Sequence, residues 1–372
     1  MTWFRADADA GPAGGAGLSG AGRGSILAGM VSMRMTRQRL LYGLTMAAGL
    51  GGLAGAIALI AQSGFNRTFS LLVAMQWGFL WLIPVRLGVV SLNAQAWRVL
   101  LRAWLRVSLP FLVWVALVRD AVNNLLPVFR VGGDAAGLRL LVRRGLAGAP
   151  AMATIVVETT TTIFVQILFS LLGVGLLLSY VHRGQLVSDV VYGIGVAIIV
   201  VIVFFVVQTR GRLFVRVEKI FRWLSGRSFA EGTEGQAIDQ SIQALYHRPR
   251  LIARCGLWQL ASLFGGAGEV WVIFRILGVA VSPRLAILFE SMIQGLQSAA
   301  FIVPGALGVQ EGGLVAAGVV AGVPMDVALA VSLTRRLRQI VFGLPVLGSW
   351  VRSERRLRTA QNLERQTQAG SV

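Results

Sequence analysis

The sequence predicts an all-α polytopic membrane protein with six to eight transmembrane helices and two broken or re-entrant membrane segments. The chain of 372 residues is 55% hydrophobic and has a mean hydropathy of +0.71, well above the range of soluble proteins. Its net charge of +19 comes from basic residues in short loops between apolar stretches, as the positive-inside rule describes. The segment 301–313, FIVPGALGVQEGG, is too rich in proline and glycine for a plain helix, which indicates a re-entrant loop.

The apolar segments divide into crossings and shorter pieces. Residues 109–126 contain an arginine, an aspartate and two asparagines, so a lipid-exposed crossing there is unfavourable and the segment is expected to enter and return. The segment 286–303 is expected to do the same, and 314–323 has only half the length of a span. The expected crossings are residues 40–61, 69–90, 149–180, 190–208, 257–279 and 325–350.

The transmembrane domain is expected to cover residues 40–351. Residues 1–39 are rich in glycine and alanine and are expected to be disordered; Met30, Met33 and Met35 are alternative starts. A cytoplasmic loop is expected at 209–254, and a cytoplasmic C-terminal tail at 352–372. Repeat units are expected at about 69–180 and 257–350.

Two matching motifs predict the repeat. Pro127 is followed seven residues later by Asp134, and Pro304 is followed seven residues later by Glu311. If the segment 109–126 does not cross, three crossings separate equivalent spans, and the halves have opposite orientation, as in many secondary transporters. An eight-crossing arrangement stays open. The glycines assigned to the two motifs are Gly132 and Gly133, and Gly305, Gly308, Gly312 and Gly313.

The charge distribution tests this topology independently. With both termini cytoplasmic and both short segments re-entrant, only Arg67, Arg183 and Arg284 lie in external loops. Making either segment a crossing without compensation would place arginine-rich loops outside, against the positive-inside rule.

Three predicted helices carry polar stripes at helical spacing. Because buried carboxylates avoid lipid, the stripes are expected to meet in one water-accessible chamber. The stripes are Glu158, Thr162, Gln166 and Ser170; Gln259, Ser262, Gly266 and Glu269; and Glu290, Gln294 and Gln297.

Arg335, Arg336 and Arg338 lie near the middle of the last expected span. A guanidinium cannot become neutral, so these side chains must be paired or hydrated. They outnumber the carboxylates that the sequence places nearby, which predicts an anionic partner such as a lipid phosphate. The alternative is that they pair with Glu158 and Glu311 and hold the repeats together.

For the other acidic residues, structural and functional interpretations both stay open. Asp134 and Glu311 either cap or pair within their segments, or contact a headgroup or carry a proton. Arg119 is expected to pair with its neighbour Asp120. The residues expected to bind substrate are Arg335, Arg336, Glu311, Glu158, Asp134, Glu269, Glu290 and Gln294.

Several functions are not expected from the residues available. One cysteine, Cys255, and two histidines, His182 and His247, offer neither a disulfide nor a multi-cysteine metal site, and no cofactor is expected. The sequence lacks a basic and aromatic soluble module for nucleic acid. Without Ser-His or Cys-His spacing for a nucleophile and its base, an enzyme is not expected.

The segments NNLLPVFRVGGD (123–134), FIVPGALGVQEGG and SLTRRLRQ (332–339) resemble the membrane region of the lysylphosphatidylglycerol synthase flippase-like family. Within it, the chain is most similar to hopanoid-biosynthesis-associated inner-membrane proteins of bacteria, over roughly residues 35–355. The resemblance implies an inner-membrane protein that handles membrane lipids with anionic or zwitterionic headgroups and translocates them between leaflets. Lipid aminoacylation is not expected, since no transferase domain follows Val372. The alternatives are a non-transporting partner of a lipid or hopanoid biosynthetic complex, and a membrane-embedded lipid-modifying enzyme.

Overall fold

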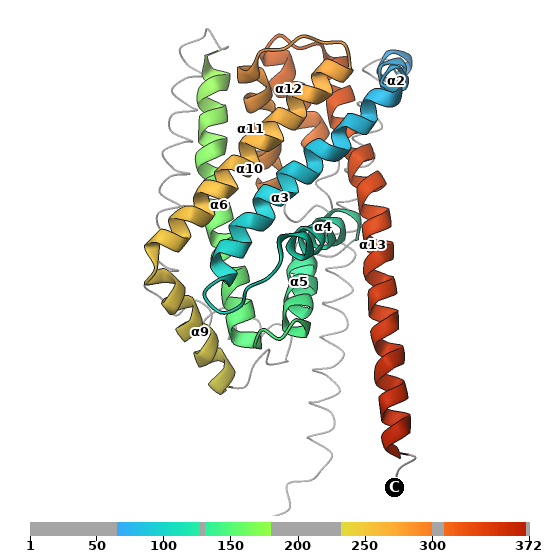
Figure 1. Ribbon diagram of the computed structural model, residues 1–372. Coiled ribbons are helices and arrows are strands. Elements are labelled where there is room, and N and C mark those ends of the chain that lie inside the picture. Colours follow the sequence, from blue (N-terminus) through green and yellow to red (C-terminus); the bar gives the residue numbers. More distant parts are fainter. Residues whose placement is uncertain (1–64, 127–130, 180–231, 300–308, 370–372) are drawn as a thin grey trace, which may run out of the picture. The chain divides into compact units, whose positions relative to one another are not determined.

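The computed structural model describes residues 65–126, 131–179, 232–299 and 309–369, and every regular element in these ranges is helical (Figure 1). The all-α membrane fold is therefore confirmed. The elements are α2 (Phe65–Ala74), η1 (Gln76–Trp81), α3 (Leu82–Leu101), α4 (Leu109–Leu125), α5 (Val131–Arg143), α6 (Gly148–Leu178), α9 (Gly232–Tyr246), α10 (Pro249–Ile276), α11 (Pro283–Ala299), α12 (Val309–Val320) and α13 (Met325–Ala369). The predictions for residues 1–39, 40–61 and 190–208, and for His182, Pro127, Pro304, Gly305 and Gly308, lie outside the described residues.

Within the described ranges, three helical stretches have the length and hydropathy of a membrane span: Gln76–Leu101, Gly148–Leu178 and Pro249–Ile276. The span predicted at 149–180 is confirmed. The span predicted at 69–90 is placed too early, because the helix direction breaks at Gln76, where φ is 38°. Arg86 lies inside this span, and its guanidinium pairs with Asp120 over 2.7 Å.

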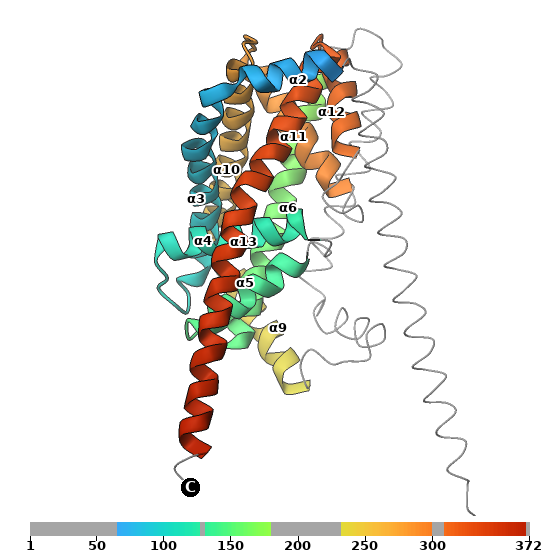
Figure 2. The ribbon, with the colours of Figure 1, turned by 90° about the vertical axis from the view of Figure 1, so that its right-hand side faces the viewer.

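Helices α4 and α11 have 17 residues each, or about 25 Å at 1.5 Å per residue. A bilayer core is about 30 Å thick, so neither helix spans it alone. Helices α5 and α12 are shorter still, with 13 and 12 residues. Helix α4 appears end-on in Figure 1 and lengthwise in Figure 2, so it lies across α6 rather than along it. These lengths agree with the prediction of two segments that enter and return.

The pairs α4–α5 and α11–α12 pack at opposite ends of the long helix α6. Near its start, Ala151 and Ile155 belong to a hydrophobic cluster with residues of α4 and α5. Near its end, Gly173 lies so close to Ser291 of α11 that an added Cβ would overlap the serine hydroxyl.

Helix α13 meets the same two pairs in the reverse order. Its early residue Ala328 packs on Gly318 of α12, whereas its later residue Gly343 packs on Leu125 of α4. Figure 2 shows α13 extending past α12 and then past α4 and α5. Helices α6 and α13 therefore run in opposite directions between the two pairs.

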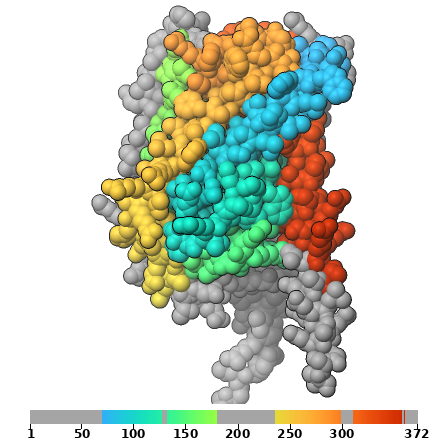
Figure 3. All heavy atoms as spheres, viewed as in Figure 1, coloured from blue at the N-terminus to red at the C-terminus, as the bar shows by residue number. Residues whose placement is uncertain are grey.

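Helices α3 and α10 pack antiparallel and lie side by side in Figure 3. Gly78, just before α3, contacts Ile276, while the later residue Asn93 donates a hydrogen bond to Gln259 over 2.9 Å. The helices cross near Gly265, where an added Cβ would lie 3.2 Å from Cγ2 of Val89. The shift that places Pro127 on Pro304 also places Gly88 on Gly265, Arg143 on Val320 and Gly148 on Met325. Arg143 and Val320 are the last residues of α5 and α12, and Gly148 and Met325 are the first residues of α6 and α13.

The glycines before and after the motif carboxylates lie in helices, which corrects the prediction of irregular backbone there. Gly132, Gly133, Gly312 and Gly313 belong to α5 and α12. An added Cβ on Gly133 would lie 2.5 Å from the carbonyl oxygen of Arg119, and one on Gly313 would lie 2.4 Å from Cδ1 of Leu296. At these two positions glycine permits close helix contact.

Two predicted loop regions contain helix. Helix α9 lies within 209–254 and packs on α6 and α10, and α10 itself begins at Pro249. His247 is exposed, as expected for a solvated side chain. Helix α13 continues to Ala369, and Glu354 binds Arg143 with oxygen–nitrogen distances of 2.5 and 2.9 Å. Much of the predicted tail is therefore helical.

Candidate functional site

Charged side chains gather between the helices instead of facing outward. Burial of an ion inside a membrane protein is costly unless it is paired and hydrogen-bonded, so such a cluster marks a candidate functional site. The arginines are Arg86, Arg119, Arg335, Arg336 and Arg338, and the carboxylates that pair with them are Asp120, Asp134, Glu158, Glu269, Glu290 and Glu311.

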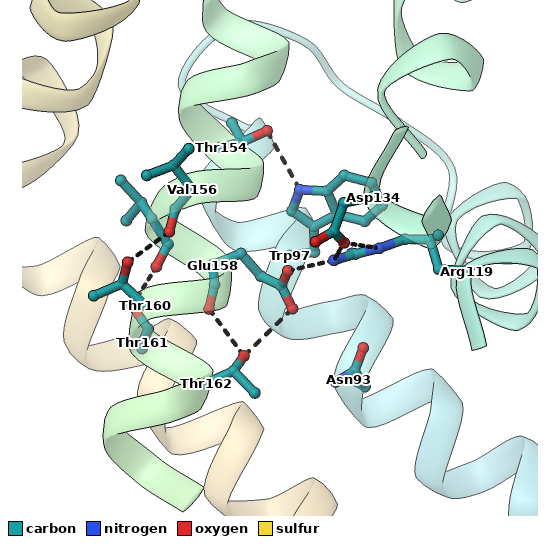
Figure 4. Close-up of polar contacts among 12 residues, drawn as sticks. Asn93, Trp97, Arg119, Asp134, Thr154, Val156, Glu158, Thr160, Thr161 and Thr162 are labelled. Carbon is teal, nitrogen blue, oxygen red and sulfur yellow. Dashed lines mark hydrogen bonds and ion pairs between the residues drawn. The ribbon is translucent and has the colours of Figure 1, made fainter. Parts of the chain in front are cut away.

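Arg119 of α4 binds two carboxylates at once, and we call Arg119, Asp134 and Glu158 the Arg119 cluster (Figure 4). Nη2 of Arg119 lies 2.6 Å from Oδ1 of Asp134 and 2.9 Å from Oε2 of Glu158. Nε of Arg119 donates a second hydrogen bond to Asp134 over 3.1 Å. The guanidinium also stacks over the ring of Trp97 at 4.5 Å, and the Trp97 indole donates to Thr154. One guanidinium thus connects α4, α5 and α6.

Asp134 occupies the first turn of α5, where the helix dipole favours a negative charge. The start of this helix is fixed to α4, because the backbone N–H of Gly133 donates to Oδ1 of Asn123 over 2.9 Å. Glu311 occupies the same place in the first turn of α12. Both motif carboxylates therefore hold a helix start and pair with an arginine, which is the geometry of the structural alternative.

The second oxygen of Glu158 accepts from α10. Nε2 of Gln259 donates to Oε1 of Glu158 over 3.0 Å, and Nδ2 of Asn93 donates to Oε1 of Gln259 over 2.9 Å. The hydroxyl of Thr162 lies 3.4 Å from the same Glu158 oxygen and donates to the Glu158 carbonyl over 2.9 Å. A hydrogen-bond chain therefore links α3, α10 and α6.

Arg335, Arg336 and Arg338 of α13 each pair with a carboxylate, which corrects the prediction of unmatched positive charge. Arg335 pairs with Glu290 of α11, and Arg336 pairs with Glu311 of α12 over 3.2 Å. Nε of Arg338 lies 2.9 Å from Oε1 of Glu269 of α10. These arginines therefore need no anionic partner for charge balance. The structural alternative was right for Glu311 and wrong for Glu158, because Glu158 pairs with Arg119.

The predicted local pair of Arg119 and Asp120 is also wrong. Consecutive helix residues point about 100° apart, so these side chains face different neighbours. Asp120 instead accepts from Arg86 of α3 over 2.7 Å, and Arg86 lies 3.9 Å from Glu269. A crevice beside this group is lined by Arg86, Leu117, Asp120, Ala121, Asn124, Arg338, Gln339, Phe342, Gly343 and Val346.

The three polar stripes meet, as predicted. Besides the bond from Gln259 to Glu158, Gln166 donates to Gln294 over 3.0 Å, and Gln294 donates to Glu290 over 2.6 Å. Gly266 leaves room for Glu290, because an added Cβ would lie 2.7 Å from Oε1 of that glutamate. The contacts are direct side-chain contacts, and the water-accessible chamber stays a prediction.

Arg86, Asn93 and Trp97 of α3 were missed by the sequence reasoning. Their spacing of seven and four residues places them on one helix face, so the signal was present in the sequence. It was hidden because the predicted span ended at residue 90.

The fold and the buried ion pairs define a polytopic helical membrane protein with a charged core. Residues 41–346 match the family model described as the lysylphosphatidylglycerol synthase TM region, and the chain belongs to this family. No curated protein and no solved structure matches the chain.

Proposed function

We propose that this protein moves a polar lipid between the leaflets of a bacterial inner membrane. The supporting observation is a series of buried polar groups inside an apolar helix assembly, from the Arg119 cluster, through the chain of Gln166, Gln294, Glu290 and Arg335, to the hydrogen bond between Gln297 and Gln310 on α12. Such groups are costly at membrane depth and commonly mark a substrate or ion path. The family description places the chain among membrane proteins with a lipid-related function.

The headgroup is proposed to move along this network by replacing ion pairs in turn. Asp120, Asp134 and Arg336 are more accessible, with side chains 39%, 28% and 16% exposed. Glu158, Arg335 and Glu290 lie deeper, at 5% exposure or below. The full proposed set of headgroup contacts is Arg335, Arg336, Glu311, Glu158, Asp134, Glu269, Glu290 and Gln294. Phosphate suits the guanidiniums, and an ammonium group suits the carboxylates, so anionic and zwitterionic lipids both fit.

We further propose that the two halves form an inverted repeat with both termini cytoplasmic. The opposite directions of α6 and α13 and the antiparallel contact of α3 with α10 support this arrangement. The segment from Pro127 to Asp134 would then open inside and that from Pro304 to Glu311 outside. Single cysteines in each segment, after replacement of Cys255, would be labelled from opposite sides. Labelling from the same side would contradict the inverted repeat.

Transport is tested with purified protein in vesicles that carry labelled phospholipid or hopanoid lipid. Movement of label to the other leaflet is expected, and Glu290→Gln should slow it. The matched control is Glu354→Gln, which removes a carboxylate from an ion pair outside the network. A chemically altered lipid would favour a lipid-modifying enzyme. Unchanged lipid without movement would favour a non-transporting partner of a lipid or hopanoid biosynthetic complex, the latter association resting on the resemblance alone.

A further inference from the structure

The Arg119 cluster contains two carboxylates and one guanidinium. Among the described residues, no second lysine, arginine or histidine forms an ion pair with Asp134 or Glu158. Both carboxylates use the same Nη2 atom of Arg119. With all three groups ionised, the cluster has a net charge of −1 at membrane depth, which is costly.

The other buried ion pairs are balanced. Arg335 pairs with Glu290, and Arg336 pairs with Glu311. The remaining group contains two guanidiniums and two carboxylates: Arg86, Arg338, Asp120 and Glu269. Among the ion pairs that the described residues form, the excess negative charge therefore belongs to the Arg119 cluster.

We propose that Glu158 binds and releases a proton, and that this proton is the coupling ion of lipid translocation; the coupling rests on the proposed function. Both carboxylates contact the same Nη2 atom, so a proton on the more buried of them removes the unmatched charge. Glu158 is that group, since its side chain is 5% exposed and that of Asp134 is 28% exposed. Asp134 is the more exposed member and gives the proton its way to water.

The surroundings of Glu158 favour a proton over a metal ion. Its Oε1 atom accepts from the Gln259 amide over 3.0 Å, and its Oε2 atom accepts from Arg119 over 2.9 Å. Donors repel a cation. The described residues also contain no group of three or more histidine, cysteine, aspartate or glutamate side chains that could hold a metal ion.

The titratable groups around Glu158 come from four helices. Helix α4 contributes Arg119, α5 contributes Asp134, and α10 contributes the buried Cys255. Helix α9 contributes Tyr246, which lies beside Thr160 of α6. Helix α3 presents Asn93 and Trp97, which do not titrate. Of these groups, Asp134 is the one that shares the Arg119 guanidinium with Glu158.

Protonation of Glu158 has a structural consequence. A protonated Glu158 has one O–H donor and keeps acceptor lone pairs, so it still accepts from the Gln259 amide. The Thr162 hydroxyl oxygen lies 3.4 Å from Oε1 and can accept the new proton's hydrogen bond, because its own hydrogen points to the Glu158 carbonyl. Neutral Glu158 loses its ion pair with Arg119, which retains Asp134. The proton thereby weakens the connection of α6 to α4.

The proton site is tested by infrared spectroscopy of the protein in lipid nanodiscs as pH is varied. A protonated-carboxyl band that titrates with pH is expected in the wild type and absent in Glu158→Gln. Asp134→Asn leaves one carboxylate, Glu158, for the one guanidinium of Arg119. The protonated-carboxyl band of Glu158 should therefore move to lower pH. Glu311→Gln, which changes a buried carboxylate already matched by Arg336, should leave the band unchanged. If no titrating band depends on Glu158, or if sodium ions bind there instead, the proposal is overturned.

The coupling is tested separately in vesicles with an imposed pH gradient. The gradient should accelerate movement of labelled lipid by wild-type protein and have no effect on Glu158→Gln. Equal acceleration of both proteins would overturn proton coupling through Glu158 while leaving lipid translocation in place. The spectroscopic measurement needs no transport, so its failure is distinguishable from failure of the proposed function.

Discussion

The half from α3 to α6 and the half from α10 to α13 have similar helices, but the buried glutamate and arginine exchange places between the long helix and the short one. In the first half, the glutamate lies on the long helix and the arginine on the short one, as Glu158 on α6 and Arg119 on α4. In the second half, Arg335 lies on the long helix α13 and Glu290 on the short helix α11. Asp134 and Glu311 lie in the first turns of α5 and α12.

The halves differ in how the first-turn carboxylate is matched. Asp134 shares Arg119 with Glu158, whereas Glu311 has the second arginine Arg336. Among the described residues, the pairs of Arg335 and Arg336 are therefore balanced, and the Arg119 cluster is not. The comparison teaches that a repeated helix plan can carry a charge-matched structural pair in one half and a group able to change its charge in the other.

The largest effect is expected when a matched pair in the second half is broken. Arg335→Leu leaves Glu290, which is 2% exposed, without its partner. The loss of stability should be about 3–5 kcal/mol, because the uncompensated charge stays buried. Thermal unfolding of the purified protein measures it. Adding Glu290→Leu should restore most of the stability; an equally unstable double variant would show that the arginine acts through other contacts.

Replacing an arginine by lysine should reduce lipid movement to a different extent in the two halves. Arg119 binds two carboxylates through Nε and Nη2, a geometry that one ammonium group reproduces poorly. Arg336 contacts a single carboxylate oxygen of Glu311 through Nε over 3.2 Å. Arg119→Lys should therefore reduce lipid movement more than Arg336→Lys at similar expression. Equal loss in both variants would contradict the assigned difference, and full activity in both would exclude a role for the guanidinium fork.

Replacing the two closely packed glycines by alanine should destabilise the two halves to different extents. A Cβ on Gly133 meets a backbone oxygen at 2.5 Å, which cannot move without shifting α4. A Cβ on Gly313 meets the end of the Leu296 side chain, which can rotate. Gly133→Ala should cost about 1–3 kcal/mol and Gly313→Ala less, by the usual cost of overpacking. Thermal unfolding of the two variants measures the difference, and the reverse order of stability would contradict these two helix contacts.

The smallest effect on stability is expected for an ion pair that lies outside the buried charged groups of both halves. Glu354→Gln removes the ion pairs of α13 with Arg139 and Arg143. Such pairs near the surface contribute about 0–1 kcal/mol and are screened by salt. The unfolding temperature should fall slightly at low salt and match that of the wild type at high salt. A large loss at high salt would mean that this contact fixes the position of α13 on α5.

The helix plan could be predicted from the sequence to a large extent. Hydropathy and length located α6 at almost its observed bounds, and the charges within 109–126 indicated a segment too polar for an exposed span. The polar stripes were also predictable, because helical periodicity fixes which side chains share a face. Gly133 and Gly313 were assigned to irregular backbone, since sequence does not distinguish a glycine needed for φ from one needed for close contact.

The pairing of charges was decided by the tertiary structure alone. Sequence proximity favoured Arg119 with Asp120, yet Arg119 reaches Asp134 and Glu158, and Asp120 reaches Arg86. The composition established that charges must be buried in an apolar assembly, because lipid offers them no partner. Which carboxylate neutralises which guanidinium depends on how the helices cross. That geometry left one carboxylate of the Arg119 cluster in excess.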